Sequence, residues 1–247
     1  MRVYVVRPYH LGLILMGLVV TLGLTIGSQR IIRSLPTVAQ GPIYQVDTSD
    51  KIIALTINVD WGEENLPAML ETLKKEGVKA TFFVSGRWAK NNPDMIKKMA
   101  AEGHEVENHG YSHPHPDKIS VDENKREILR TEQVIEGLTG KKTTYFAPPY
   151  GEKGANGLRA AKELGYTTTL FSLDTIDWHP NTTVENIVQR AVYPQAKMGV
   201  KPEKKGAIVL LHPKPNSVKA LPTIILQLKQ EGFHIVTISE LVTNRKN

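Results

Sequence analysis

The chain has 247 residues, 40% of them hydrophobic and 23% charged, which is typical of a globular protein and excludes a disordered one. Its 31 basic and 25 acidic residues give a net charge of +6, which suits contact with anionic polymers but is as often only a contribution to solubility. The absence of cysteine excludes disulfides, thiolate zinc sites and cysteine nucleophiles. Because no basic stretch is interleaved with aromatic residues, no nucleic-acid partner is expected.

A stretch of 17 residues without charge, LGLILMGLVVTLGLTIG at 11–27, follows Arg2 and Arg7. This length is at the short end of what crosses a bilayer and is also typical of the core of a signal peptide. Since no small-x-small cleavage site follows, we expect residues 1–33 to anchor the protein to the cell membrane, outside the cytoplasm. The alternative is cleavage and secretion. Residues 34–50 are predicted to be a linker to a single domain at 51–247.

From residue 51 onward, strand-like apolar runs alternate with helical patterns, which is typical of an α/β fold. Because no glycine-rich dinucleotide turn follows the first strand, a (β/α) barrel fits better than an open, doubly wound sheet. Two helices are expected to begin with capping boxes, Ser120-x-x-Glu123 and Thr182-x-x-Glu185. Strands are predicted at 52–59, 80–84, 104–107, 144–147, 167–173, 207–211 and 233–237. Helices are predicted at 66–76, 95–102, 120–138, 157–164, 182–192 and 217–230.

Polar and aromatic residues follow five of these strands, at the end where the active sites of such barrels lie. Loops with a purely structural role would not need to repeat this pattern. The residues are Asn58, Asp60, Trp61 and Gly62; Asn108, His109 and His113; Pro148, Pro149, Tyr150 and Gly151; Asp174, Asp177 and Trp178; and His212.

The segment 103–115, GHEVENHGYSHPH, holds four of the eight histidines of the chain. Imidazole binds Zn²⁺ well, and a short turn can bring His109 and His113 to one ion. A third ligand from an aspartate would leave one position open for water, as a catalytic zinc site requires. A histidine pair with this spacing is often incidental, but its clustering at a strand end favours a metal site.

His212 follows the apolar run 208–211 and is a candidate general acid, because imidazole titrates near neutral pH. Asp174 or Asp177 is expected to orient it and to hold it in the protonated form. The alternative is a core histidine whose hydrogen bonds are made to the backbone.

Tyr150 follows two prolines that stiffen its loop, and its backbone N–H is a candidate donor to a developing oxyanion. Trp61 and Trp178 would then form the walls of a groove, as aromatic faces do for sugar rings.

With these residues in place, the domain resembles the polysaccharide deacetylases, the family-four carbohydrate esterases with the NodB-type fold. The resemblance implies a deformed barrel of seven or eight βα units that holds one divalent metal, Zn²⁺ with Co²⁺ or Ni²⁺ as substitutes. The Trp–Gly pair and the N-terminal anchor resemble the membrane-anchored branch of spore-forming bacteria. The resemblance rests on five ordered motifs: 56–62 (TINVDWG), 109–113 (HGYSH), 147–151 (APPYG), 174–178 (DTIDW) and 210–212 (LLH).

The resemblance also implies roles for single residues, carried over by position. The metal ligands would be Asp60, His109 and His113, and His212 would protonate the leaving amine. The substrate would be an N-acetylated glycan, peptidoglycan or chitin-like, whose acetamide is hydrolysed. The residues implied to contact it are Trp61, Pro149, Tyr150, Trp178 and Leu210.

Two departures from the family pattern concern the base that activates water. Asn58 stands at the base position, and a neutral amide does not accept a proton at neutral pH. The arginine that pairs with the base in the family is here Ala147. Asp60 is also one position further from residue 58 than in the family's Asp–Asp pair, so it would bind the metal, serve as a displaced base, or do neither.

A missing general base lowers a rate by about 10²- to 10⁴-fold, while metal and oxyanion stabilisation remain. We therefore expect a metal-dependent polysaccharide N-deacetylase of the cell envelope with weakened activity. The alternative is a non-catalytic glycan-binding pseudoenzyme that retains the metal site. A third possibility is another metal-dependent hydrolysis on the same barrel.

Overall fold

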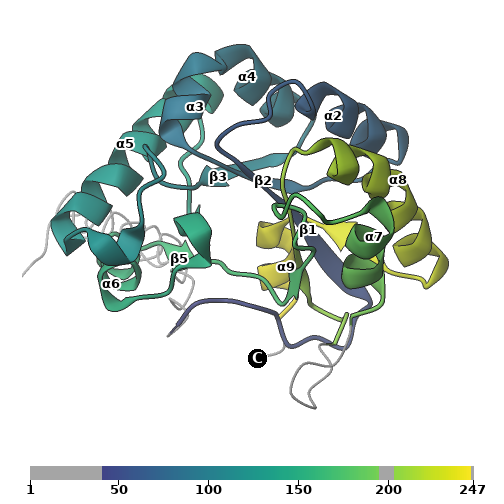
Figure 1. Ribbon diagram of the computed structural model, residues 1–247. Coiled ribbons are helices and arrows are strands. Elements are labelled where there is room, and N and C mark those ends of the chain that lie inside the picture. Colours follow the sequence, from purple (N-terminus) through teal and green to yellow (C-terminus); the bar gives the residue numbers. More distant parts are fainter. Residues whose placement is uncertain (1–40, 195–202, 246–247) are drawn as a thin grey trace, which may run out of the picture. The chain divides into compact units, whose positions relative to one another are not determined.

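The computed structural model describes residues 41–194 and 203–245, and the predicted anchor at 1–33 lies outside these ranges. Among the described residues, no helix is both long and apolar enough to cross a bilayer. The fold that they form is α/β, with helices packed around one parallel sheet (Figure 1).

The sheet of the described region has 8 strands, in the order β5-β4-β3-β2-β1-β7-β6, with β8 paired to the first residues of β1. No pairing joins β5 to β6 among these strands, so the expected barrel is deformed and open on that side. The strands are β1 (Ile52–Val59), β2 (Thr81–Val84), β3 (Glu105–Asn108), β4 (Tyr145–Phe146), β5 (Thr167–Thr168), β6 (Leu173–Asp174), β7 (Ile208–Leu211) and β8 (His234–Val236).

The segment 43–46 lies beside the open part of the sheet, although it belongs to the stretch expected to be a linker. Ile43 N–H donates to Thr168 O at 2.8 Å, and Val46 N–H donates to Gly206 O at 2.9 Å. Ile43 and Val46 are both buried. Residues 43–46 therefore pair with the strand region on both sides of the gap.

Two short helices, α3 and α9, were not predicted, because six residues are too few to show a helical period. Each begins at a side-chain cap: Ser85 Oγ accepts from Trp88 N–H, and Thr237 forms a capping box with Glu240. The helices are α2 (Leu66–Lys75), α3 (Gly86–Asn91), α4 (Pro93–Ala101), α5 (Val121–Thr139), α6 (Ala155–Glu163), α7 (Val184–Val192), α8 (Pro215–Gln230) and α9 (Ile238–Thr243), with 3-10 turns η1 (Pro116–Lys118) and η2 (Pro149–Gly151).

One of the two predicted capping boxes is confirmed and the other is wrong. Ser120 and Glu123 form both bonds of a box at the start of α5. At α7 the cap is Thr183, whose side chain accepts from Asn186 N–H, whereas Thr182 Oγ donates to Ile176 O at 2.7 Å. The hydroxyl of Thr182 is thus used to hold the preceding loop.

The predicted strand at 167–173 is also wrong as a single element, because it divides into β5 and β6. Between them, Thr169 N–H still bonds to β4, but Leu170 N–H donates to Ile43 O at 2.7 Å. The chain then leaves β4 and reaches β7, where Leu173 pairs with Val209. The open side of the sheet is the consequence.

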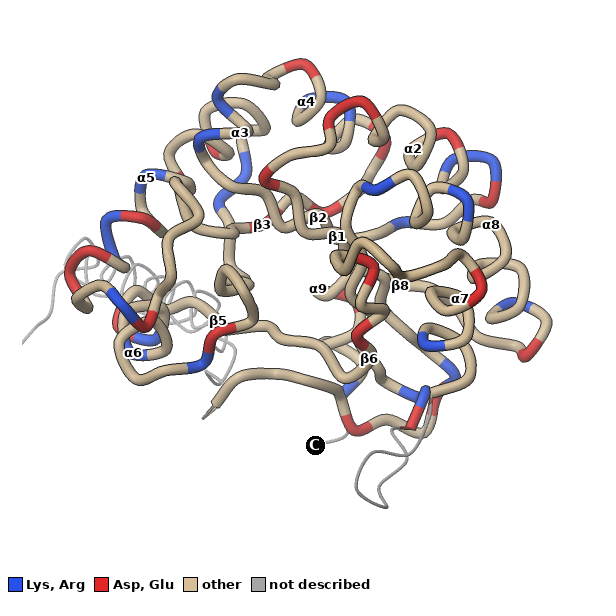
Figure 2. Tube along the Cα trace, viewed as in Figure 1, with Lys and Arg blue, Asp and Glu red and all other residues tan. Residues whose placement is uncertain are grey.

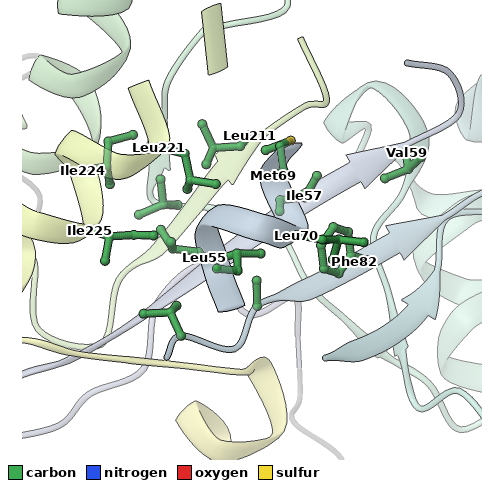
Figure 3. Packing of buried hydrophobic residues seen from close by; sticks show 14 of the residues in the cluster. Leu55, Ile57, Val59, Met69, Leu70, Phe82, Leu211, Leu221, Ile224 and Ile225 are labelled. Carbon is green, nitrogen blue, oxygen red and sulfur yellow. The ribbon is translucent and has the colours of Figure 1, made fainter. Parts of the chain in front are cut away.

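All eight residues of β1 are buried, as expected for a central parallel strand covered on both faces. Leu55, Ile57 and Val59 point toward α2 and α8 and form the main apolar cluster with residues of those helices (Figure 3). The alternating residues, Thr56 and Asn58, face the other side, where they line the interior of the deformed barrel. This alternation puts residue 58 inside the barrel.

His104, at the entry to β3, has a structural role. Its side chain is fully buried, its ring packs edge-on against Phe82 with centroids 5.3 Å apart, and its Nδ1 accepts from Ala80 N–H at 3.2 Å. Burial lowers the pKa of His104 from 6.5 to about 4. The imidazole is therefore neutral in the folded protein at neutral pH.

We predict that His104 makes folding stability depend on pH. The folded-state pKa lies below the unfolded value, so its contribution is present above pH 6.5 and is lost as pH falls toward about 4. Urea unfolding at pH 4 to 7 should show this decline in the wild type and a flatter profile in His104→Asn, which keeps an acceptor for Ala80. His234→Asn, on an exposed residue, is the control; an unchanged slope in His104→Asn would contradict the assignment.

Candidate functional site

The candidate site residues come together at the C-terminal ends of the central strands. Asp60 follows β1, His109 follows β3, Tyr150 lies in η2 beyond β4, and His212 follows β7. The charge of His212 acts on both His109 and His113, and that of Asp60 acts on His113. Asp60, His109, His113 and His212 therefore lie near one another in one site, although their individual contacts differ from those expected.

His109 and His113 lie against each other, with ring centroids 4.9 Å apart and ring planes at 68°. His109 Nδ1 is 2.7 Å from Ala147 O and must donate to it, because a carbonyl oxygen only accepts. Its Nε2 is left with a free lone pair, the arrangement typical of a histidine that binds a metal.

The turn between the two histidines is held by Glu127 of α5. One carboxylate oxygen of Glu127 accepts from Tyr111 N–H at 2.9 Å, from Ser112 N–H at 2.6 Å and from Ser112 Oγ at 3.0 Å. His113 has a φ of 57°, which costs energy for a residue with a Cβ. Glu127 of α5 thus holds a strained turn in which the ring of His113 faces that of His109.

Both imidazoles are kept neutral by their surroundings. Burial lowers the pKa of His109 to about 3. Burial also lowers the pKa of His113, against the opposing effect of the nearby Asp60 carboxylate. A neutral imidazole is the form that coordinates a metal, so the pair suits a divalent ion.

Asp60, the third expected ligand, is engaged elsewhere. Its carboxylate accepts from Ser85 Oγ at 2.5 Å and from Arg87 Nη2 at 3.1 and 3.3 Å. Within 41–194 and 203–245, no three His, Asp or Glu side chains lie close enough together to hold a metal ion. The histidine pair fits a metal, whereas Asp60, the third expected ligand, is hydrogen-bonded to Ser85 and Arg87.

Asn58 lies at the base position with no carboxylate beside it. Its side chain and Ala147 line a void of about 10 Å³, which is at the lower limit for a single water. Leu210 and Thr169 line the same void, and the buried Thr169 Oγ1 has no hydrogen-bond partner within the described residues. The void therefore has a few polar groups in a mostly apolar lining, and none of its lining residues takes up a proton at neutral pH.

His212 is held by Asp177 and not by Asp174, which settles the alternative left open by the sequence. Asp177 Oδ1 accepts from His212 Nδ1 at 2.8 Å, and its Oδ2 accepts from His212 N–H and Ser217 Oγ, both at 2.6 Å. Asp174 instead accepts from Ile176 N–H at 2.8 Å. His212 is thus fixed at two points, with Nε2 left free.

The aromatic residues named from the sequence are exposed, but Trp61 and Trp178 do not both line the hollow beside Asp177. The Trp61 ring is 42% exposed and stacks near-parallel on His212, with centroids 6.0 Å apart. Trp61 also lines a hollow of about 310 Å³ that extends past Asp177 to Lys214. Trp178 is not among the residues that line this hollow; its ring contacts His179.

Tyr150 sits at the rim of the histidine pair and is 59% exposed. Pro148, the residue before η2, and Pro149 precede it; Gly151 N–H donates to Pro148 O, and Tyr150 takes a φ of 60°. Its ring contacts His113 edge-on and stacks on His115 with centroids 3.9 Å apart. His115 was given no role from the sequence, because only the fold brings it beneath Tyr150.

We predict that Asp177→Asn lowers the free energy of unfolding by about 1–3 kcal/mol. An amide has one acceptor oxygen for three donors, so at least one buried donor loses its partner. Asp174→Asn is the matched control, because its amide oxygen still accepts from Ile176 N–H. Urea unfolding of both variants measures the difference; equal losses would contradict the special role of Asp177.

Comparisons with known proteins agree with this geometry. The sequence model of a family described as polysaccharide deacetylase matches residues 45–169. The chain is 36% identical over 203 residues to the uncharacterized protein YlxY of Bacillus subtilis (strain 168), covering 81% of this chain and 60% of that protein. It is 35% identical over 201 residues to a peptidoglycan-N-acetylglucosamine deacetylase of Bacillus cereus, covering 78% and 69%. The chain thus spans less than two thirds of the first of these relatives.

Among solved structures, the fold is similar to that of a CE4 family pseudoenzyme from Bacillus anthracis. The identity is 38% and the TM-score 0.75, with 84% of this chain and 70% of that chain covered. A mutant of the same pseudoenzyme, described as having restored enzymatic activity, gives 36% identity and a TM-score of 0.75, with coverage of 84% and 73%.

Proposed function

The chain belongs to the polysaccharide deacetylase family, and on this basis we propose that it acts on N-acetylated glycan of the cell wall with weakened deacetylase activity. The bond concerned is the amide carbon–nitrogen bond of an N-acetylated sugar. The observation that carries the proposal is Asn58. It faces the barrel interior beside Ala147, in a void that no carboxylate lines.

Other residues of the site are assigned the remaining roles of a deacetylase in this proposal. His212, held by Asp177, is placed to give a proton to the leaving amine through Nε2. Trp61 beside it offers a flat apolar face to a sugar ring. Tyr150, whose ring contacts His113, would supply its backbone N–H to the developing oxyanion. Only the group that takes the proton from water has no counterpart at residue 58.

Enzymes of this family are generally metal-dependent. His109 and His113 would hold a divalent ion here, with Asp60 as the third ligand, and Zn²⁺ suits this donor set, as do Co²⁺ and Ni²⁺. Such an ion would supply Lewis-acid activation of water and of the acyl oxygen. Arg87 competes with it for the carboxylate of Asp60.

A second candidate function is glycan binding without turnover. It is favoured by the joint replacement of the base and its arginine partner by Asn58 and Ala147, and by the similarity to the Bacillus anthracis pseudoenzyme.

For either function, we propose that residues 1–33 anchor the protein to the membrane on the outer side, where the wall glycan is located.

Acetate release from N-acetylglucosamine oligomers and peptidoglycan tests the proposal, with the full chain and added Zn²⁺ or Co²⁺. We expect slow release by the wild type and a gain of about 10²- to 10⁴-fold in Asn58→Asp, which restores a carboxylate. Asn91→Asp, the same change on an exposed residue, is the control and should show no gain. Adding Ala147→Arg should destabilise the protein, because the void beside residue 147 is about 10 Å³.

Three other outcomes have distinct meanings. If only the carboxylate variants release acetate while the wild type binds the oligomers, the glycan-binding function is correct. If the wild type turns over, Asp60→Ala abolishes it and Asn58→Asp adds nothing, the base is Asp60. If no variant binds or hydrolyses any N-acetylated glycan, the proposed function is wrong.

We predict that the chain binds one Zn²⁺ and that Arg87 weakens this binding. Titration calorimetry of the full chain should show loss of binding in His113→Ala. Arg87→Gln should bind more tightly, because Asp60 is released from its ion pair. Arg126→Gln, an exposed arginine of α5, is the control. Unchanged affinity in His113→Ala would exclude this metal site.

A further inference from the structure

A hollow of about 480 Å³ lies between α3 and α5, next to the turn that carries the two histidines. Two cationic side chains line it, Lys90 from α3 and Arg130 from α5, together with the ring of Tyr111. No carboxylate is among the lining residues, and its apolar part comes from Val134 and Leu138 of α5. We call this hollow the α3–α5 pocket.

Tyr111 is fixed in this pocket by close packing. A Cβ on Gly86 would lie 2.5 Å from Tyr111 Cδ2, so the ring rests directly on the backbone at the start of α3. Arg87 N–H donates to Tyr111 O at 2.9 Å. The guanidinium of Arg130 then lies over the ring, 3.7 Å from its centroid. Tyr111 thus positions the guanidinium of Arg130 at the pocket.

Neither cation of the α3–α5 pocket has an anionic partner in the part of the chain that the structure describes. Arg130 and Lys90 make no ion pair there, whereas Arg87 on the same α3 is paired with Asp60. Glu127, one turn before Arg130, is directed to the histidine turn, where its Oε2 accepts three hydrogen bonds from Tyr111 and Ser112, and it forms no ion pair with Arg130 among the described residues. Figure 2 shows basic residues on both α3 and α5.

We propose that the α3–α5 pocket binds a carboxylate carried by the same glycan strand whose acetamide enters the histidine site. The two sites are joined by one short turn, since Tyr111 lies between His109 and His113 in the chain. A guanidinium held flat on an aromatic ring presents two parallel N–H donors, which match a carboxylate. This inference rests on the proposed function. It predicts that the protein prefers a glycan strand with carboxylates, of the peptidoglycan type, to a neutral, chitin-type strand.

The test compares the affinity of the full chain for three probes: a neutral N-acetylglucosamine tetramer, a peptidoglycan fragment of equal length with lactyl and peptide carboxylates, and the same fragment with its carboxyl groups amidated. We expect the acidic fragment to bind about 10-fold more tightly than the other two. Arg130→Gln should remove this preference and leave the affinity for the tetramer unchanged. Lys90→Gln should reduce the preference in part.

Arg126→Gln removes an exposed charge from the same helix outside the α3–α5 pocket and should keep the preference. Equal binding of the acidic and amidated fragments would overturn the inference, and so would an equal loss in Arg126→Gln, which would indicate general surface charge. Competition by a phosphate-bearing wall polymer that Arg130→Gln abolishes, without any carboxylate preference, would overturn it as well. Failure to bind any of the three probes would instead contradict the proposed function.

Discussion

The site depends on the burial of one strand on both faces. β1 pairs with β7 on one side and with β2 and β8 on the other, and every residue of it is buried. Leu55, Ile57 and Val59 pack against α2 and α8. Because side chains alternate along a strand, Thr56 and Asn58 face the barrel interior. Any side chain at residue 58 therefore lies inside the barrel. An amide in place of a carboxylate removes a charge there without moving the backbone.

Hydrogen bonds made by single side chains then decide which of the neighbouring polar groups are available. Glu127 orders the histidine turn, Asp177 orders His212, and Arg87 draws Asp60 toward α3. The interior therefore contains two neutral imidazoles near an aspartate whose charge is already balanced. Under the proposed function, such a site would retain the groups that bind a cation and donate a proton but lack the group that accepts one, a combination that suits slow turnover or binding alone.

Local patterns predicted much of the fold, because they depend on residues close together in sequence. The apolar runs located the central strands, Ser120 and Glu123 located the start of α5, and strand ends located the site. What the sequence did not reveal depends on contacts between distant residues. In the sequence, Asp174 and Asp177 are equally good candidates to orient His212. Only the fold distinguishes them, because it places His212 and Ser217 of α8 beside Asp177. The pairing of Asp60 with Arg87 was hidden for the same reason, since α3 is too short to show a period. Thr183, and not Thr182, caps α7, although only Thr182 has a glutamate three residues later, because Thr182 is used to hold the preceding loop.

The segment 43–46 has a consequence for behaviour in solution. A parallel sheet that is not closed exposes unpaired N–H and C=O groups, and such edges are templates for pairing with other chains. Ile43 covers the edge next to β5, and Val46 covers the start of β7, where the backbone of Gly206 approaches so closely that no Cβ would fit. By covering these edges, residues 43–46 prevent them from pairing with the edges of other molecules. A protein trimmed beyond them would keep its site residues and yet lose solubility.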